Sequence, residues 1–332
     1  MECRMISQFL IAAPSSGSGK TTVSRGLMAL LIKKGLKVQP FKCGPDYIDT
    51  KYHTAVCGRP SINLDTFMAS AEHVGELYAR YATGADACIV EGMMGMYDGY
   101  DRDRGSSAEI ARLLNLPVVL VVDAKSAAYS MAPLLSGFLH FRPEIRIAGV
   151  IFNRVGSPRH YEMLQEVCSE LGISCLGYLP KRENLVQESR YLGLDFSRSG
   201  GTDALEELTA LMETHIDYTR LLEETMLPAP IPSTPDTFRQ GDLKISVESF
   251  SFIYQEHLDI LCRLGTVTFF NPEHNRPLPK GTDLLYLPGG YPEKCHTRLS
   301  RAWRRMQSVR NYVEAGGRVL AECGGMIYLS KG

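Results

Sequence analysis

The feature that most constrains this chain is a short loop rich in glycine and serine near its start. An apolar run over residues 5–13 leads into Pro14-Ser15-Ser16-Gly17-Ser18-Gly19-Lys20-Thr21-Thr22, and an apolar helical pattern follows. Small residues let backbone N–H groups converge on phosphate oxygens, and the first turn of a helix adds the positive end of its dipole. This order of strand, loop and helix predicts a nucleotide-phosphate site.

Single residues of this phosphate loop (residues 14–22) have distinct expected roles. Lys20 neutralises phosphate charge, and the Thr21 hydroxyl can hold Mg²⁺. The strict pattern has glycine where Pro14 stands, so the loop is a variant Walker A sequence. The predicted nucleotide-binding residues are Gly17, Ser18, Gly19, Lys20, Thr21 and Thr22.

Size and composition exclude several classes of protein. The 332 residues suffice for two domains, and a hydrophobic content of 44% with a net charge of -1 predicts a globular chain without the basic excess of nucleic-acid or membrane binders. No apolar run approaches the roughly 20 residues of a membrane span, and no signal-peptide pattern is present. The nine cysteines form no CxxC pair, which argues against a disulfide framework. We expect a cytoplasmic protein without nucleic-acid or membrane partners.

Acidic residues follow two of the predicted strands. A strand over residues 37–42 leads to Asp46 and Asp49, and a buried strand over residues 87–91 ends at Glu91. The carboxyl edge of a parallel sheet is where ligands bind, so the two aspartates could hold Mg²⁺ or position a substrate. Glu91 would be a second acidic magnesium position. The alternative for Asp46 is a local cap within a Gly-Pro-Asp turn.

Apolar strands and helical patterns alternate through the first two thirds of the chain. This alternation predicts an α/β domain over residues 1–226, with a parallel sheet covered by helices and one helical stretch over residues 203–222. The proline-dense residues 227–241 are expected to form an extended linker. A second α/β pattern occupies residues 242–332.

Two glycine loops mark the second domain. Residues 283–293 predict a strand running into a tight Gly289-Gly290 loop, whose N–H groups could stabilise an oxyanion. Residues 318–326 predict a strand that meets a helix through a sharp turn with Cys323 at its apex, as in a nucleophile elbow. A helix N-terminus would favour the thiolate. The alternative is a buried cysteine at the end of a strand, but the two glycine loops together favour a nucleophile.

Six segments taken together resemble the cobyrinic acid a,c-diamide synthase family. They are residues 14–22, 42–49, 63–65, 91–99, 287–293 and 321–325. The resemblance implies a dethiobiotin-synthetase-like P-loop NTPase domain joined to a class I-like glutamine amidotransferase domain. It also implies ATP and Mg²⁺ as cofactors, a corrinoid or related tetrapyrrole substrate, glutamine or ammonia as the nitrogen donor, and a plausible homodimer.

The reaction implied by the resemblance is ATP-dependent amidation of the a and c carboxylates of cobyrinic acid, in cobalamin biosynthesis, through an acyl phosphate. Cys323 would form the glutamyl thioester that releases ammonia. The same resemblance places residues near the metal and the substrate. The implied metal ligands are Thr21, Asp46 and Glu91, and the implied catalytic residues are Cys323, Asp46, Tyr47, Asp49 and Asp98, with Tyr47 and Asp98 on the substrate side.

The sequence departs from the family pattern after Cys323. The family's glutaminase domain places its triad histidine and carboxylate further on, whereas this sequence ends at Gly332. His257, His274 and His296 precede the nucleophile and are expected at the surface or in loops. We therefore expect a polypeptide shortened within an incomplete glutaminase domain, without normal glutaminase activity.

Other substrates and one other class of function fit part of the pattern. Hydrogenobyrinic acid or nickel-sirohydrochlorin could replace cobyrinic acid in the same chemistry. A nucleotide switch of the MinD/ParA kind would also bind ATP, but it predicts an amphipathic membrane-targeting tail or a basic partner surface. The C-terminal part of this sequence offers an elbow cysteine instead.

Overall fold

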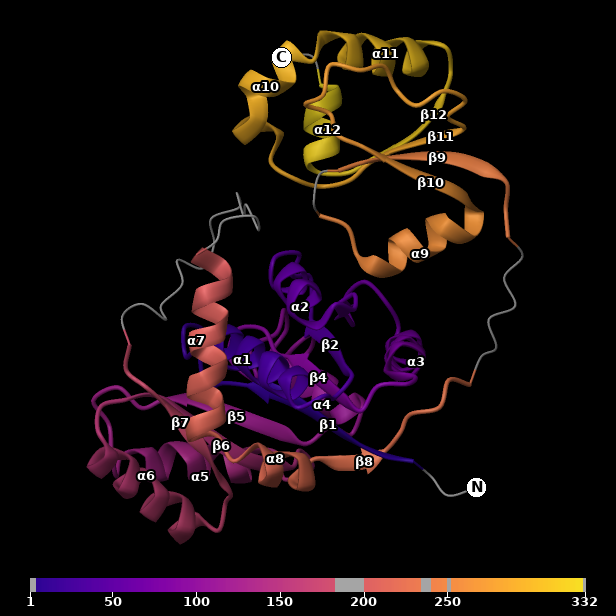
Figure 1. Cartoon of the computed structure of the whole chain (residues 1–332). Coiled ribbons are helices and arrows are strands. Elements are labelled where there is room, and N and C mark those ends of the chain that lie inside the picture. Colours follow the sequence, from indigo (N-terminus) through magenta and orange to yellow (C-terminus); the bar gives the residue numbers. More distant parts are fainter. Residues whose placement is uncertain (1–3, 183–199, 234–239, 250–251, 331–332) are drawn as a thin grey trace. The chain divides into compact units, whose positions relative to one another are not determined.

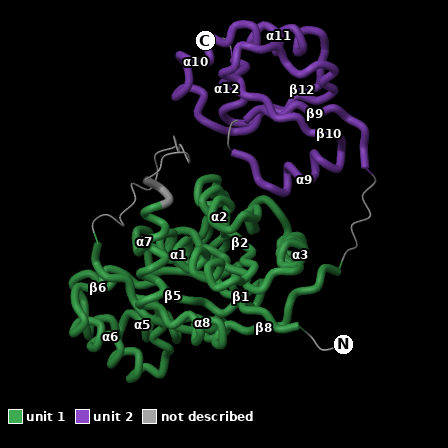
Figure 2. Tube along the Cα trace, viewed as in Figure 1, with its two compact units in different colours: residues 1–234 green, residues 235–332 purple. Residues whose placement is uncertain are grey.

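The computed structural model describes residues 4–182, 200–233, 240–249 and 252–330 (Figure 1). The chain divides into two compact units, Met1–Thr234 and Pro235–Gly332 (Figure 2). Each unit is a sheet of mainly parallel strands with helices packed on it, so the predicted α/β class is confirmed.

The first unit is built on an eight-stranded sheet. Its main row has the order β3-β2-β4-β1-β5-β6-β7, and every neighbouring pair in this row is parallel. The carboxyl ends of the strands therefore share one edge. The strands are β1 (Met5–Ala12), β2 (Val38–Cys43), β3 (Ile62–Leu64), β4 (Ala87–Glu91), β5 (Val118–Asp123), β6 (Ile147–Val155), β7 (Cys175–Pro180) and β8 (Met226–Pro228).

The last strand of this unit, β8, runs antiparallel to the start of β1, with Met226 opposite Ser7. Hydrogen bonds between side chains support the pairing, since Ser7 Oγ and Thr225 Oγ1 lie 2.7 Å apart. Gln8 Nε2 also donates to the Pro228 carbonyl at 2.9 Å. The sheet thus includes the first two residues of the predicted 227–241 linker, of which residues 234–239 lie outside the described part of the chain.

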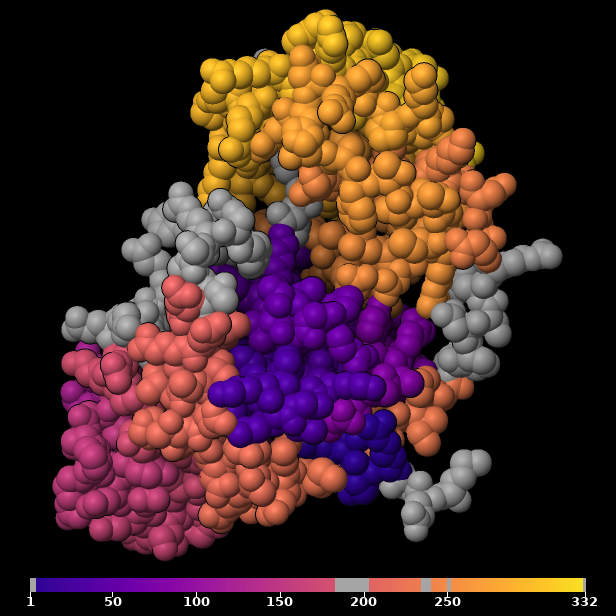
Figure 3. All heavy atoms as spheres, in the orientation of Figure 1, coloured from indigo at the N-terminus to yellow at the C-terminus, as the bar shows by residue number. Residues whose placement is uncertain are grey.

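The strands of this sheet are buried on both faces, because helices pack against each face. Along β1, Leu10 and Ala12 pack into the core under α3 to α6, whereas Phe9 and Ile11 pack into the core under α1 and α7. Figure 3 shows the salmon atoms of α7 lying against the indigo and purple atoms of the first part of the chain. The helices are α1 (Lys20–Lys33), α2 (Asp49–Cys57), α3 (Ala71–Ala82), α4 (Ser107–Leu113), α5 (Met131–Phe141), α6 (Pro158–Leu171), α7 (Gly200–His215) and α8 (Tyr218–Glu224).

The helical stretch predicted over residues 203–222 is interrupted. The structure has two helices there, because the Asp217 side chain accepts a hydrogen bond from the backbone N–H of Arg220 at 3.0 Å and starts α8. The prediction of one continuous stretch is therefore wrong at this point. Serine caps of the same kind begin α3, α4 and α6.

The second unit has a smaller, four-stranded parallel sheet of order β10-β9-β11-β12. Tyr286 packs on one face of it, and its neighbours Leu285 and Leu287 pack on the other. Its elements are β9 (Leu243–Glu248), α9 (Gln255–Leu264), β10 (Gly265–Phe270), β11 (Leu284–Leu287), the 3₁₀ turn Pro292–Cys295, α10 (His296–Arg301), α11 (Trp303–Glu314), β12 (Arg318–Ala321) and α12 (Gly324–Leu329). No helix in the described ranges of either unit is long and apolar enough to cross a bilayer.

Two half-buried cysteines of the first unit are expected to react very differently with iodoacetamide. Hydrogen bonding with Cys168 and with the Tyr161 hydroxyl lowers the pKa of Cys175 to about 6, whereas burial raises the pKa of Cys57 to about 12. The thiolate is the reactive form, so at pH 7 alkylation of Cys175 should exceed that of Cys57 by at least about tenfold. Peptide mass spectrometry over a time course measures both sites, with Cys175→Ser as the control. Equal rates would contradict the hydrogen bonding at Cys175.

Candidate active site

The phosphate loop connects β1 to α1 in a conformation that requires glycine. Gly17 and Gly19 have φ of 81° and 101°, which residues with a Cβ rarely adopt. A side chain at Gly19 would also collide with Asn153, whose Nδ2 donates to the Ser18 carbonyl at 2.9 Å. The predicted strand, loop and helix are present, and the loop is held in shape from the end of β6.

A second residue at the end of β6 holds the same loop. Arg154 Nη2 donates to the Gly17 carbonyl at 3.1 Å, and its Nη1 lies 2.5 Å from Asp123 Oδ2 at the end of β5. The sequence analysis assigned no role to Asn153 or Arg154. Their position near the end of a strand could have indicated a role, because the ends of β1, β5 and β6 meet at one edge of the sheet.

Lys20 turns toward the loop that follows β4. Its Nζ donates to the Met94 carbonyl, and the side chain is almost wholly buried. Burial lowers the pKa of Lys20, and the positive charge of Lys42 lowers it further. Asp98, predicted on the substrate side, is exposed and closes a turn of this loop by accepting the Gly95 N–H at 3.0 Å.

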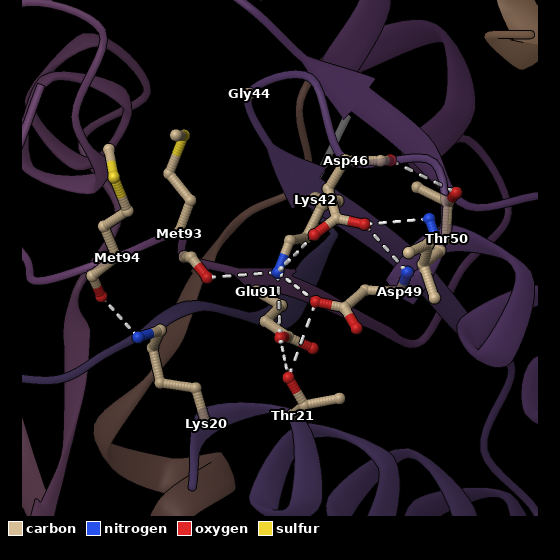
Figure 4. A network of polar contacts seen from close by, with 12 residues as sticks. Lys20, Thr21, Lys42, Gly44, Asp46, Asp49, Thr50, Glu91, Met93 and Met94 are labelled. Carbon is tan, nitrogen blue, oxygen red and sulfur yellow. Dashed lines mark hydrogen bonds and ion pairs between the residues drawn. The ribbon is translucent and has the colours of Figure 1, made fainter. Parts of the chain in front are cut away.

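Lys42 lies at the centre of a carboxylate cluster at the carboxyl edge of the sheet (Figure 4). Its Nζ is 2.6 Å from Asp49 Oδ2, 2.9 Å from Glu91 Oε1 and 3.8 Å from Asp46 Oδ2. We call these four residues the Lys42 cluster. The three predicted carboxylates are therefore together. The lysine that joins them is the first residue of the 42–49 segment, and the sequence analysis gave it no role.

The pKa values of the cluster follow from its burial and its charges. Burial alone would lower the pKa of Lys42, but Glu91 and Asp49 outweigh it and hold the pKa above its ordinary value. Burial would raise the pKa of Glu91, but Lys42 holds it well below the usual range. Burial and the Glu91 charge raise the pKa of Asp49 to about 7. Near neutral pH the cluster thus contains an ionised Lys42–Glu91 pair, and Asp49 is its proton-accepting member.

Thr21 connects the phosphate loop to this cluster. Its Oγ1 donates to Glu91 Oε1 at 2.7 Å and lies 3.5 Å from Asp49 Oδ2. Asp46 uses one oxygen differently, since Oδ1 accepts the backbone N–H groups of Ile48 and Asp49 at 2.8 and 2.9 Å. This is the local cap that the sequence offered as an alternative. Tyr47 lies half-buried in the same turn.

The donor set fits magnesium bound together with a nucleotide. In the described ranges, no group of three or more His, Cys, Asp or Glu side chains is arranged to hold a metal by itself. Mg²⁺ at nucleotide sites takes one or two carboxylates, phosphate oxygens and waters. Thr21, Asp49 and Glu91 supply a hydroxyl and carboxylates at one point, next to the phosphate loop.

A fully buried histidine adjoins the cluster and was not found from the sequence. His53 Nε2 lies 2.7 Å from Glu91 Oε2. His53 follows Asp49 by four residues on α2, so both side chains lie on one face of that helix. That spacing was the available signal, but α2 itself fell within a stretch of sequence whose helix was not predicted.

The predicted elbow is present in the second unit. Cys323 is exposed at φ 46°, between β12 and α12. A side chain at Gly324 would collide with the Gly290 backbone, and a Cβ on Gly289 would lie 3.5 Å from the Cys323 Cβ. The two glycine loops therefore lie against each other at the cysteine. Tyr286 secures the turn by donating to Glu322 Oε2 at 2.6 Å.

The histidines of this unit have other neighbours. His296 Nδ1 and Nε2 lie 3.1 Å from the Glu293 carbonyl and the Thr297 hydroxyl, and the His257 ring packs on Tyr254. Over residues 240–249 and 252–330, no histidine is hydrogen-bonded to the Cys323 thiol. The structure thus presents a nucleophile and a glycine loop without an adjacent imidazole in this part of the chain.

Comparison with known proteins places both units. Residues 9–191 match the model of the CobQ/CobB/MinD/ParA nucleotide binding domain, and residues 244–332 match that of the CobB/CobQ-like glutamine amidotransferase domain. The cobyrinate a,c-diamide synthase of Caldanaerobacter subterraneus subsp. tengcongensis is 44% identical over 99% of this chain and 74% of the relative. The chain belongs to the a,c-diamide synthase family.

Two further a,c-diamide synthases support this assignment. The cobyrinate a,c-diamide synthase of Salmonella typhimurium is 38% identical over 97% of this chain and 72% of its own length. The hydrogenobyrinate a,c-diamide synthase of Streptomyces coelicolor is 38% identical over 98% of this chain and 76% of its own length. The predicted family, its amidotransferase domain and its ligase class are confirmed. The nucleotide-switch alternative has no better support.

Proposed function

We propose that this chain catalyses ATP-dependent amidation of the a and c carboxylates of cobyrinate. The observation that carries the proposal is the convergence of Thr21 with Asp49 and Glu91 at the carboxyl edge of the first unit, beside the phosphate loop. Relatives named as cobyrinate a,c-diamide synthases support the substrate. A homodimer and a cytoplasmic location stay predictions from the sequence.

The first half-reaction transfers phosphate to the substrate. A carboxylate oxygen attacks the γ-phosphorus of ATP, ADP leaves, and an acyl phosphate forms. Backbone N–H groups of the phosphate loop and Lys20 would bind the phosphates, while Thr21, Asp46, Asp49 and Glu91 would hold Mg²⁺ or orient the substrate. Mg²⁺, when bound, neutralises charge on the phosphates. Tyr47 and Asp98 would lie on the substrate side.

The second half-reaction forms the amide. Ammonia attacks the acyl carbon, the C–O bond to phosphate breaks, and the nitrogen loses a proton, so one ATP is used for each amide. Glutamine would supply ammonia through a thioester on Cys323, with N–H groups near Gly289 and Gly290 facing the oxyanion. Two rounds give the a,c-diamide.

A second candidate substrate is hydrogenobyrinate. The Streptomyces coelicolor relative carries that name and matches 98% of this chain. The two substrates differ in whether cobalt occupies the macrocycle. Cys323 would act on glutamine and the Lys42 cluster would lie near the reacting carboxylate, so neither site would distinguish the two macrocycles. Parallel assays with both compounds decide between them.

We expect this chain to amidate cobyrinate with ammonium as the nitrogen donor and to use glutamine much less efficiently. The reason is that Cys323 has no imidazole partner among the described residues of its unit. Mass spectrometry of the product, with ATP and either donor, measures both rates. Cys323→Ser is the control, because it should leave the ammonium reaction unchanged. Equal rates with glutamine would contradict the expectation about Cys323, and no product from either macrocycle would overturn the proposed function.

A further inference from the structure

The two oxygens of Glu91 have different partners. Glu91 is the last residue of β4, and its side chain is wholly buried. Oε1 faces Thr21 Oγ1 at 2.7 Å and Lys42 Nζ at 2.9 Å, whereas Oε2 faces His53 Nε2 at 2.7 Å. One oxygen therefore points to the phosphate loop, and the other is fixed from behind.

His53 is held at both ring nitrogens. The ionised Oε2 of Glu91 can only accept, so His53 Nε2 donates to it. His53 Nδ1 lies 3.2 Å from the hydroxyl of Ser61, which is buried just before β3. The Ser61 N–H in turn donates to Thr54 Oγ1 at 2.9 Å. The ring thus has one orientation set by α2 and by the segment that leads into β3.

Burial decides what kind of role His53 can have. Its side chain has no exposed surface, so neither nucleotide nor substrate can touch it. It can act only through Glu91. A group that is hydrogen-bonded to a metal ligand orients that ligand, and removing such a group commonly weakens metal binding by about 10–100-fold.

We propose that His53 is a positioning residue that fixes Glu91 so that Oε1 meets the divalent cation arriving with the nucleotide. This inference rests on the proposed function, which assigns Glu91 to that cation. It adds that the hydrogen bond from His53 on α2 sets the cation affinity, although His53 lies outside the phosphate loop.

Mn²⁺ binding tests the proposal without turnover. Free Mn²⁺ is counted by electron paramagnetic resonance in the presence of adenylyl imidodiphosphate, a nonhydrolysable ATP analogue. His53→Leu should weaken Mn²⁺ binding by about 10-fold or more, whereas His53→Gln, whose amide can still donate to Glu91, should restore most of it. The affinity for the analogue in EDTA should stay unchanged in both variants. A purely structural role would instead lower both affinities together.

His160→Leu is the matched control. His160 is also engaged at both ring nitrogens, by the Ala127 carbonyl at 2.6 Å and the Gly156 N–H at 3.2 Å, but it contacts no member of the Lys42 cluster. Its loss should leave Mn²⁺ affinity unchanged. If His53→Leu is not recovered folded, Ser61→Ala removes the second anchor of the His53 ring and should weaken Mn²⁺ binding by about threefold. This is less than the about 10–100-fold expected for a group bonded directly to the metal ligand, because Ser61 acts on Glu91 only through His53.

Glu91→Gln separates failure of this inference from failure of the proposed function. If Glu91→Gln weakens Mn²⁺ binding and the His53 variants do not, the inference about His53 is overturned and the role of Glu91 stands. If Glu91→Gln itself binds Mn²⁺ like the unaltered protein, the proposed metal assignment is wrong. Unchanged affinity in both His53→Leu and Ser61→Ala overturns the positioning role.

Discussion

Lys42→Met is expected to lower the free energy of unfolding of the first unit by about 3–5 kcal/mol, because it leaves buried carboxylates without a compensating charge. Lys42 is 3% exposed, and Glu91 beside it is wholly buried. Pulsed labelling of Cys88, buried on β4, along a guanidinium gradient reports unfolding of this unit. Fluorescence of Trp303, the chain's single tryptophan, reports unfolding of the second unit. The midpoint of that transition should be the same in Lys42→Met and in the unaltered protein.

Two further variants show whether charge is the cause. Adding Glu91→Gln to Lys42→Met should recover part of the lost stability, because it removes one uncompensated buried charge. Lys33→Met, which breaks an exposed ion pair with Glu213, should cost less than about 1 kcal/mol. If Lys42→Met also lowers the free energy of unfolding by less than about 1 kcal/mol, then Lys42 does not neutralise the cluster.

Lys20→Met is expected to reduce the rate of ATP-dependent amidation by about 10²–10³-fold, the usual effect of removing one donor that stabilises developing charge. The fold should survive, because Lys20 Nζ donates its hydrogen bond to the Met94 carbonyl in a loop rather than to a group within a strand or helix. Single-turnover amide formation with ammonium measures the effect without any contribution from glutamine hydrolysis.

The control for Lys20 lies on the same helix. Lys33→Met removes an equal charge from the last turn of α1, away from the phosphate loop, and should amidate at the unaltered rate. A normal rate in Lys20→Met would show that the phosphate loop is not the site of the reaction. A rate lowered equally in both variants would indicate a general loss of positive charge instead.

Residues at the ends of strands could be predicted from the sequence, whereas residues inside elements could not. Asp49 and Glu91 follow apolar strands, and the carboxyl edge of a parallel sheet collects ligands, so their meeting was predictable. Lys42 lies within β2, where every residue is buried, so no alternation of polar and apolar residues reveals which way it points. His53 lies within a largely polar helix with the same ambiguity.

Long-range pairing was the other limit of the sequence. Proline-dense composition predicts a linker from residue 227, and it carries no sign that Leu227 will pair with Ile6. The contact between Asn153 and the phosphate loop is a second example, because neither segment alone shows that it will bond to the other. Local patterns predicted the alternation of strands and helices in both units, although not α2 or β8. Only the folded sheet shows which distant side chains support the loop.

The support of the phosphate loop from β6 has a consequence for synthesis of the chain. A ribosome releases residues 14–22 early, but the Asn153 side chain that bonds to Ser18 comes 135 residues later in the sequence. The partner of Ser7, Thr225, emerges later still. A nascent chain therefore carries the variant Walker A sequence long before it carries the residues that hold this loop in shape.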